Sequence, residues 1–255
     1  MPEEPVPAEA PPGQTPDPEE PVPTGPALAV FAHPDDAEIS AGGVLRKWVL
    51  AGREVHLLVL TNGDRGSDDP KRDRAELAAT RKQETQDAAD VLGLKCARVL
   101  DIHDGDLVNT KEIQAEVSLT VRQVRPETVL TCDPTAWFFE DRYFNHSDHR
   151  TAGAIALDGV FPGAGNPHFF TEQLVDGLEP WNVPKVWLGW TNEPNRYEDI
   201  SGLMETKLAA LAAHRSQVEG DLLGFFEEWL PAEAVEAGKL IGVEHAESFR
   251  VLQLG

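Results

Sequence analysis

Four short apolar runs, each ending in polar turn residues, dominate the first half of this 255-residue chain. Continuous apolar runs of this length are typical of strands that are buried on both faces, as the strands of a parallel sheet are. The runs lie at 27–32, 55–60, 97–102 and 128–131.

Helical patterns separate these runs, at about 40–50, 72–92 and 111–124. Gly52 and Gly93 follow the first two patterns, where a helix commonly ends on glycine. The alternation predicts an α/β fold with a Rossmann-like, mostly parallel sheet and helices on both faces. The second half is less regular, and we expect it to complete the same domain. Its expected elements are a strand near 185–190, a helix near 202–213, an amphipathic stretch near 222–236 and a final strand near 249–254.

Residues 1–26 differ from the rest of the chain. They hold ten of the 20 prolines and six acidic residues, but no basic residue. A segment with so little apolar surface cannot offset its ordering entropy, so we predict a disordered tail. Residues 27–255 are predicted to form one folded domain.

The formal net charge of −22 argues against binding to nucleic acid or to anionic membranes through bulk charge. The sequence shows no signal peptide and no long apolar run, so we expect a cytoplasmic protein. Two cysteines, Cys96 and Cys132, are too few for a disulfide framework. Each lies in an apolar run, which favours buried free thiols.

The first cluster of chemically active side chains follows the first apolar run. Ligands collect at the carboxyl ends of the strands of a parallel sheet, and this chain has His33-Pro34-Asp35-Asp36 at such an end. Imidazole and carboxylate groups together suit zinc, and a cation would relieve the repulsion between the two carboxylates. A helix N-cap is an equally good interpretation of this cluster alone.

A second cluster, His146-Ser147-Asp148-His149, follows the fourth run and a long loop. Two histidines three residues apart at the start of a helix can both lie near one metal ion. Surface histidines and an Asp helix cap are the alternative. Because both clusters follow strands of the same predicted sheet, a shared metal site is favoured over two independent structural features.

The two clusters together resemble the signature motifs of the PIG-L/LmbE-like de-N-acetylase family, and most closely its diacetylchitobiose deacetylase branch. Further segments carry the resemblance over about residues 27–255. They are Gly42-Gly43, Thr61-Asn-Gly-Asp-Arg-Gly66, Arg81, Glu84, Asp104-Gly105, Gly177-Leu-Glu-Pro180, Glu193-Pro-Asn195, His214-Arg-Ser-Gln217 and Glu247-Ser-Phe249.

The resemblance implies that His33, Asp36 and His149 ligate one divalent metal per chain, usually Zn²⁺, although other divalent metals also suit such ligands. Two positions depart from the usual family pattern: Ala37 precedes the acid Glu38, and Ser147 replaces a proline. Neither is a predicted ligand, so these departures bear on the substrate rather than on the metal.

The resemblance also implies that Asp35 is the general base and that His146 stabilises or protonates the transition state. Arg81 and Asp104 match positions that contact the sugar in relatives. The implied activity is hydrolysis of the N-acetyl group of a small N-acetylglucosamine-containing saccharide by metal-activated water. His214 lies in a helical pattern, and a structural role is favoured for it.

Two other functions remain open. A deacetylase or amidase of a glucosaminyl thiol precursor would share both motifs, and a non-catalytic, metal-stabilised carbohydrate-binding protein would share the fold. The aromatic run Trp137-Phe138-Phe139 precedes His146. Its rings would stack on a sugar, form a contact in a homo-oligomer, or pack within the loop.

Overall fold

A seven-stranded sheet in the order β3-β2-β1-β4-β7-β9-β8 forms the centre of the computed structural model, which describes residues 24–139, 141–175, 177–218 and 220–254. The strands β3, β2, β1, β4 and β7 are parallel, and β9 pairs antiparallel with both β7 and β8. The strands are β1 Ala27–Phe31, β2 Val55–Val59, β3 Cys96–Val99, β4 Thr128–Cys132, β7 Lys185–Gly189, β8 Arg196–Asp199 and β9 Ala246–Gln253. The predicted mostly parallel α/β sheet is confirmed.

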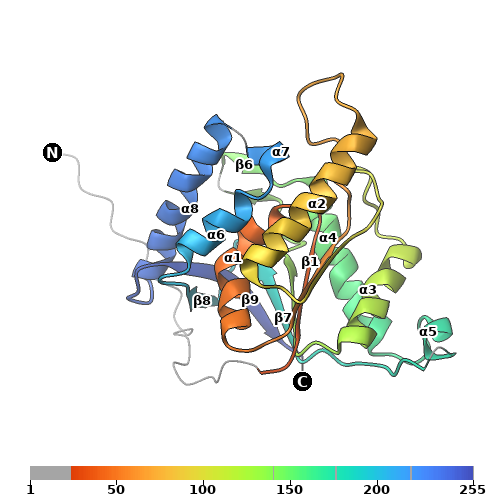
Figure 1. Ribbon diagram of the computed structural model, residues 1–255. Helices are drawn as coiled ribbons and strands as arrows, with labels where there is room; N and C mark the ends of the chain where they lie inside the picture. Colours follow the sequence, from red (N-terminus) through yellow and green to blue (C-terminus); the bar gives the residue numbers. More distant parts are fainter. Residues whose placement is uncertain (1–23, 140, 176, 219, 255) are drawn as a thin grey trace.

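Helices cover both faces of this sheet (Figure 1). On β1, Ala29 and Phe31 pack in one buried cluster with Trp48 of α1, whereas Leu28 and Val30 pack in a second cluster on the opposite face. This burial on both faces explains the unbroken apolar run. The first cluster includes side chains of α1 Asp36–Leu50, α2 Arg74–Leu92, α6 Met204–Leu211 and α8 Asp221–Lys239, and the second includes side chains of α3 Lys111–Val124 and α4 Ser147–Asp158.

The helix ends follow ordinary capping chemistry. The Asp73 side chain accepts a hydrogen bond from the backbone of Glu76 at the start of α2, and Gly93 ends that helix with a φ of 78°. The helix α3 has the predicted bounds. In contrast, α1 begins at Asp36 and not near residue 40, so the motif His33-Pro34-Asp35-Asp36 lies directly at the start of the helix.

Several elements differ from the sequence prediction. The strand β3 ends at Val99 instead of residue 102, and Cys96 at its start is exposed, so the predicted buried thiol is wrong there; Cys132 is buried. The edge strand β8 was not predicted. Other unpredicted elements are the hairpin β5 Phe138–Phe139 with β6 Tyr143–Phe144, the π-helix η1 Gly159–Ala164, and the short helices α5 Thr171–Val175 and α7 Arg215–Val218.

The predicted N-terminal tail lies outside the described residues up to residue 23. At its end, Gly25 already contacts the domain: its N–H donates to Glu127 Oε2 at 2.7 Å and its carbonyl accepts from Arg53 Nε at 2.8 Å. The contacts of the domain therefore begin before Ala27. Among the described residues, no helix is long and apolar enough to span a membrane.

Candidate metal centre

The turn after β1 is closed by its own side chains. Asp36 Oδ2 accepts a hydrogen bond from the backbone N–H of His33 at 2.8 Å, which folds the carboxylate back over the turn. Asp35 adopts the left-handed conformation, with φ 102° and ψ −23°, at the N-cap position of α1. A non-glycine residue in this region is strained, and such strain is often found at functional sites.

The second cluster lies at the start of α4. His146 is the N-cap residue, and its Nδ1 accepts a hydrogen bond from the backbone N–H of Asp148 at 3.2 Å. His149 Nδ1 lies 2.9 Å from Asn145 Oδ1, and Trp190 stacks on its ring with centroids 4.7 Å apart. These contacts fix the direction of the His149 ring and leave its Nε2 for another partner.

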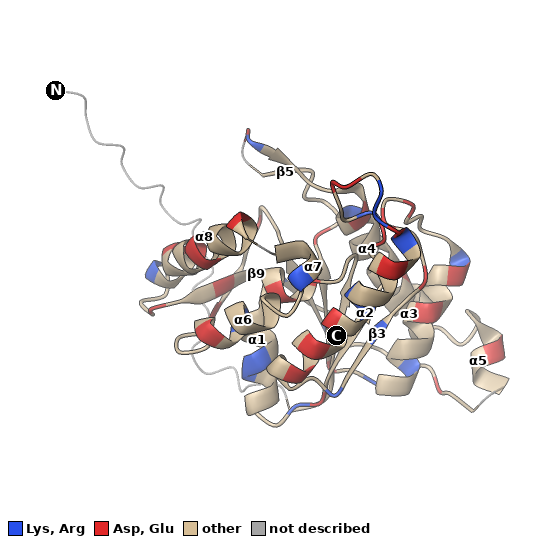
Figure 2. Ribbon diagram, turned by 45° about the horizontal axis from the view of Figure 1, so that its top comes forward, with Lys and Arg blue, Asp and Glu red and all other residues tan. Residues whose placement is uncertain are grey.

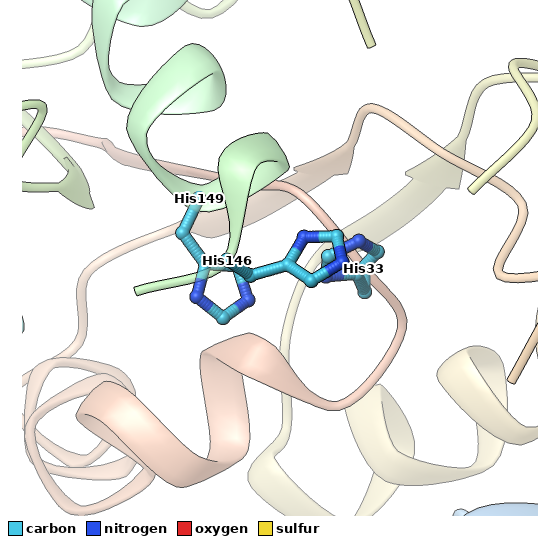
Figure 3. Close-up of side chains that lie close together, drawn as sticks. All are labelled: His33, His146 and His149. Atoms are coloured by element: carbon cyan, nitrogen blue, oxygen red, sulfur yellow. The ribbon is translucent and has the colours of Figure 1, made fainter. Parts of the chain in front are cut away.

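The two clusters meet (Figure 3). The ring centroid of His33 lies 4.8 Å from that of His146 and 5.1 Å from that of His149. Asp36 lies between two of these rings, with Oδ2 3.4 Å from His33 Nδ1 and Oδ1 3.1 Å from His149 Nε2. The three imidazoles form one group whose candidate ligand atoms all lie within 4.8 Å of one another.

A second group of candidate ligands shares His33. Its Nε2 lies 3.2 Å from Asp104 Oδ1 and 3.4 Å from Asp148 Oδ2. The side chain of His33 is almost completely buried, yet Nε2 has no partner with hydrogen-bond geometry in the described part of the chain. A buried, unsatisfied nitrogen among carboxylates is a site that fits a cation.

Burial and charge shift the pKa values of these groups. Burial lowers the pKa of His33, but the nearby carboxylates, above all Asp36, outweigh burial and raise it well above its usual value. Burial raises the pKa of Asp36, but His149 and His33 hold it well below its usual range. Burial raises the pKa of Asp35, and Arg81 only partly opposes this. Asp36 is therefore an anion suited to a metal, whereas Asp35 is a more basic carboxylate.

Arg81 lies behind Asp35. Its Nη2 donates to Pro34 O at 2.6 Å and to Asp35 Oδ2 at 3.2 Å, and its Nη1 donates to Gly63 O at 3.0 Å. Its side chain is only 3% exposed, and a Cβ at Gly63 or Gly66 would collide with the guanidinium. This burial favours a role for Arg81 in holding Asp35, and the expected sugar contact stays a prediction.

This chain matches known proteins both in sequence and in structure. The family model of PIG-L, described as GlcNAc-PI de-N-acetylase, matches residues 28–160, which is more than half of the chain. The chain belongs to the PIG-L family. It is 37% identical to the diacetylchitobiose deacetylase of Thermococcus kodakarensis over 88% of this chain and 81% of that protein.

Two further matches cover most of this PIG-L family member. The solved structure of the N,N'-diacetylchitobiose deacetylase from Pyrococcus horikoshii superposes with a TM-score of 0.82 at 34% identity, over 89% of this chain and 83% of that one. A probable N-acetyl-alpha-D-glucosaminyl L-malate deacetylase 2 of Bacillus cereus is 29% identical over 76% of this chain and 84% of that protein.

Sequence reasoning missed two carboxylates of the site. Asp148 was considered only as a helix cap, but its buried carboxylate accepts from the backbone N–H of Gly105 at 2.7 Å and faces His33. Asp64 was part of a motif without an assigned role. It accepts from the backbone N–H of Asp104 at 3.1 Å and lies 2.9 Å from His103 Nδ1, so it fixes the loop that carries Asp104. The only sequence signal for these two residues was an acidic side chain in a segment that follows a predicted strand.

Proposed function

We propose that this chain removes the N-acetyl group from an N-acetylglucosamine-containing saccharide as a zinc-dependent amide hydrolase. One observation carries this proposal: Asp36 lies between His33 and His149 next to a largely buried, strained Asp35, in a chain that is 37% identical to a diacetylchitobiose deacetylase. The fold by itself would not suffice, because one fold hosts many chemistries.

We propose that His33, Asp36 and His149 hold the metal. Two imidazoles and one carboxylate are the ligand types of catalytic zinc sites, in which a position stays open for water and substrate. When bound, zinc polarises the amide carbonyl and lowers the pKa of water toward ~7. The hydrogen bond between His149 Nδ1 and Asn145 Oδ1 supports this assignment, because it directs Nε2 toward Asp36.

Asp35 is assigned as the general base that takes the proton of the attacking water. Its carboxylate is largely buried, and burial raises its pKa, which makes it a better proton acceptor than an ordinary aspartate. The contact of Oδ2 with Arg81 at 3.2 Å restrains the rotation of the carboxylate and leaves Oδ1 for the water.

His146 is assigned to stabilise the developing oxyanion of the transition state. Its Nδ1 accepts the hydrogen bond of Asp148, so a neutral ring carries its proton on Nε2 and can donate it. Burial, together with His33 and His149, lowers the pKa of His146 and favours the neutral form in the metal-free protein. A neutral imidazole can stabilise the oxyanion by a hydrogen bond, and the proton that Asp35 takes from the water can pass to the amine as it leaves.

We expect a short saccharide as the substrate. The hairpin of β5 and β6 projects from the body (Figure 2), and Phe138 and Tyr143 on it, together with Trp137 directly before it, are more than half exposed. Asn145 joins this hairpin to the metal centre, because its backbone N–H donates to Trp137 O at 2.8 Å while its side chain contacts His149. Exposed rings beside the site can pack on the C–H faces of a sugar.

The test is acetate release from three substrates at equal concentration: N-acetylglucosamine, diacetylchitobiose and N-acetylglucosaminyl malate. We expect release that a chelator abolishes and that added zinc restores, with kcat/KM for diacetylchitobiose at least about tenfold higher than for the others. A preference for the malate glycoside would instead assign the chain to thiol-precursor metabolism. Saccharide binding without any acetate release would support the non-catalytic alternative. Cytoplasmic location and a homo-oligomeric state stay predictions.

A further inference from the structure

A buried ion pair lies near the proposed base, on residues without a role in the mechanism above. His214 Nε2 lies 3.3 Å from Glu38 Oε2, and the two side chains are 0% and 1% exposed. All four polar atoms of these side chains lack hydrogen-bond partners among the described residues. Burying two polar groups with so few partners is costly, so the pair calls for an explanation beyond packing.

The position of Glu38 connects this pair with the site. Asp35 is the N-cap residue of α1 and Glu38 lies in the first turn of that helix, so the contact of Glu38 with His214 holds the turn that carries Asp35. The pKa of His214 is affected accordingly: burial lowers it, but Glu38 and then Asp35 outweigh burial and raise it.

The residues after His214 contact the other elements that position Asp35. The backbone N–H and the hydroxyl of Ser216 each donate to Glu84 of α2 at 2.7 Å. Gln217 Nε2 donates to Gly66 O at 3.0 Å. The segment 214–217 thus contacts α1, α2 and the 63–66 loop, which are the elements that hold the Asp35–Arg81 pair.

We propose that His214, paired with Glu38, is a positioning residue that holds the first turn of α1 and, through it, the carboxylate of Asp35. Arg81 restrains one oxygen of Asp35 by a direct contact, and the His214–Glu38 pair restrains the turn on which Asp35 lies. Such a restraint matters because Asp35 lies on a strained backbone that would otherwise relax. This inference rests on the proposed role of Asp35 as the base.

The test is a double-mutant cycle of His214→Gln with Asp35→Asn, with kcat, KM, metal content and melting temperature measured for each variant. We expect His214→Gln to lower kcat about tenfold with little change in KM or metal content. In the Asp35→Asn background the same substitution should have no further effect on kcat, because no base remains to be positioned. His56→Gln, a histidine of β2 away from the site, is the control and should keep the wild-type kcat.

An equal loss of kcat from His214→Gln in both backgrounds would overturn the inference and leave a purely structural role. Glu38→Gln gives an independent measurement if His214→Gln folds poorly: it keeps the side-chain shape, removes the charge that holds His214, and should reproduce the fall in kcat. A wild-type kcat in that variant would also overturn the inference. Full activity of Asp35→Asn alone would instead overturn the proposed base.

Discussion

Two buried arginines, Arg81 and Arg122, mark two regions of this molecule with different tasks. Each residue is 2% exposed. Arg81 donates to two carbonyls and to the carboxylate of Asp35 at the carboxyl end of the sheet. Among the residues that the structure describes, Arg122 of α3 donates to neutral acceptors only, five backbone carbonyls and Gln173 Oε1.

The difference shows that a buried cation does not by itself mark a functional site. The carbonyls that Arg122 binds belong to Gly163, Ala164, Asn166, Phe169 and Phe170, so one guanidinium ties together an irregular segment of the chain. Arg81 has a carboxylate partner beside the candidate ligands. Substitutions near Arg81 should therefore change rate or metal binding, and substitutions at Arg122 should change stability.

The largest expected effect is at a metal ligand. His149→Ala should lose most of the bound metal and reduce activity at least about 1000-fold, because a three-ligand site does not hold zinc well with two ligands. The melting temperature of the metal-free protein should change little, since the sheet core does not contain His149. Elemental analysis checks the metal content, and wild-type metal content would contradict the ligand assignment.

Asp35→Asn should separate chemistry from metal binding. Asn has nearly the same shape but cannot accept the proton of the water, so kcat should fall at least about 100-fold. Metal content should match the wild type, as Asp35 is not a predicted ligand. Steady-state acetate release measures the change, and unchanged turnover would assign the base to another group.

Arg122→Met should show the opposite pattern. Removal of the guanidinium breaks its hydrogen bonds to five carbonyls and to Gln173, and the free energy of unfolding should fall by about 2 kcal/mol or more. The kcat of the folded fraction should be unchanged. Arg98→Met is the matched control, because Arg98 forms an exposed ion pair with Glu116 and should cost at most ~1 kcal/mol. Urea unfolding of both variants checks the difference.

A smaller effect should appear in the pH dependence of stability. The pKa of His214 is raised in the folded chain above its usual 6.5, because Glu38 and Asp35 outweigh burial and the repulsion of Arg81. The stabilisation from its protonation is fully present below the unfolded pKa and is lost as the pH rises through the folded pKa. The stability difference between wild type and His214→Gln should therefore shrink with rising pH. Urea unfolding at a series of pH values tests this, and a constant difference would contradict a charged His214.

The smallest effect is expected at the N-terminus. Deletion of residues 1–23 removes none of the hydrogen bonds described here and should leave the melting temperature unchanged. Deletion of residues 1–26 also removes the carbonyls of Gly25 and Pro26, to which Arg53 donates, and should lower stability by about 1 kcal/mol. Equal melting temperatures for the two deletions would show that these contacts contribute little.

The sequence predicted those elements whose signal is local. The strands β1, β2 and β4 are buried on both faces and appear as apolar runs, and α3 has a capping threonine at its start. The edge strand β8 is polar and only partly buried, and each strand of the β5–β6 hairpin has two residues, so neither produces a periodic pattern. The exposure of Cys96 likewise reflects its place on the edge strand β3.

The site was predictable in part for the same reason. His33 and His149 follow parallel strands, and the carboxyl ends of such strands lie at one edge of the sheet. The contact of Asp148 with His33 depends instead on the rotation of α4 about its axis, which no local pattern specifies. The pairing of Glu38 with His214 joins residues far apart in the chain, and tertiary packing alone sets it.

The backbone of Asp35 has a consequence for the thermal tolerance of the enzyme. A left-handed aspartate costs on the order of 1–3 kcal/mol, which glycine in its place would not incur. Asp35→Gly should therefore yield a more heat-resistant protein that lacks its base. Selection for heat resistance and selection for turnover therefore act in opposite directions at this one position. A variant library sorted only for heat resistance would become enriched in inactive enzymes.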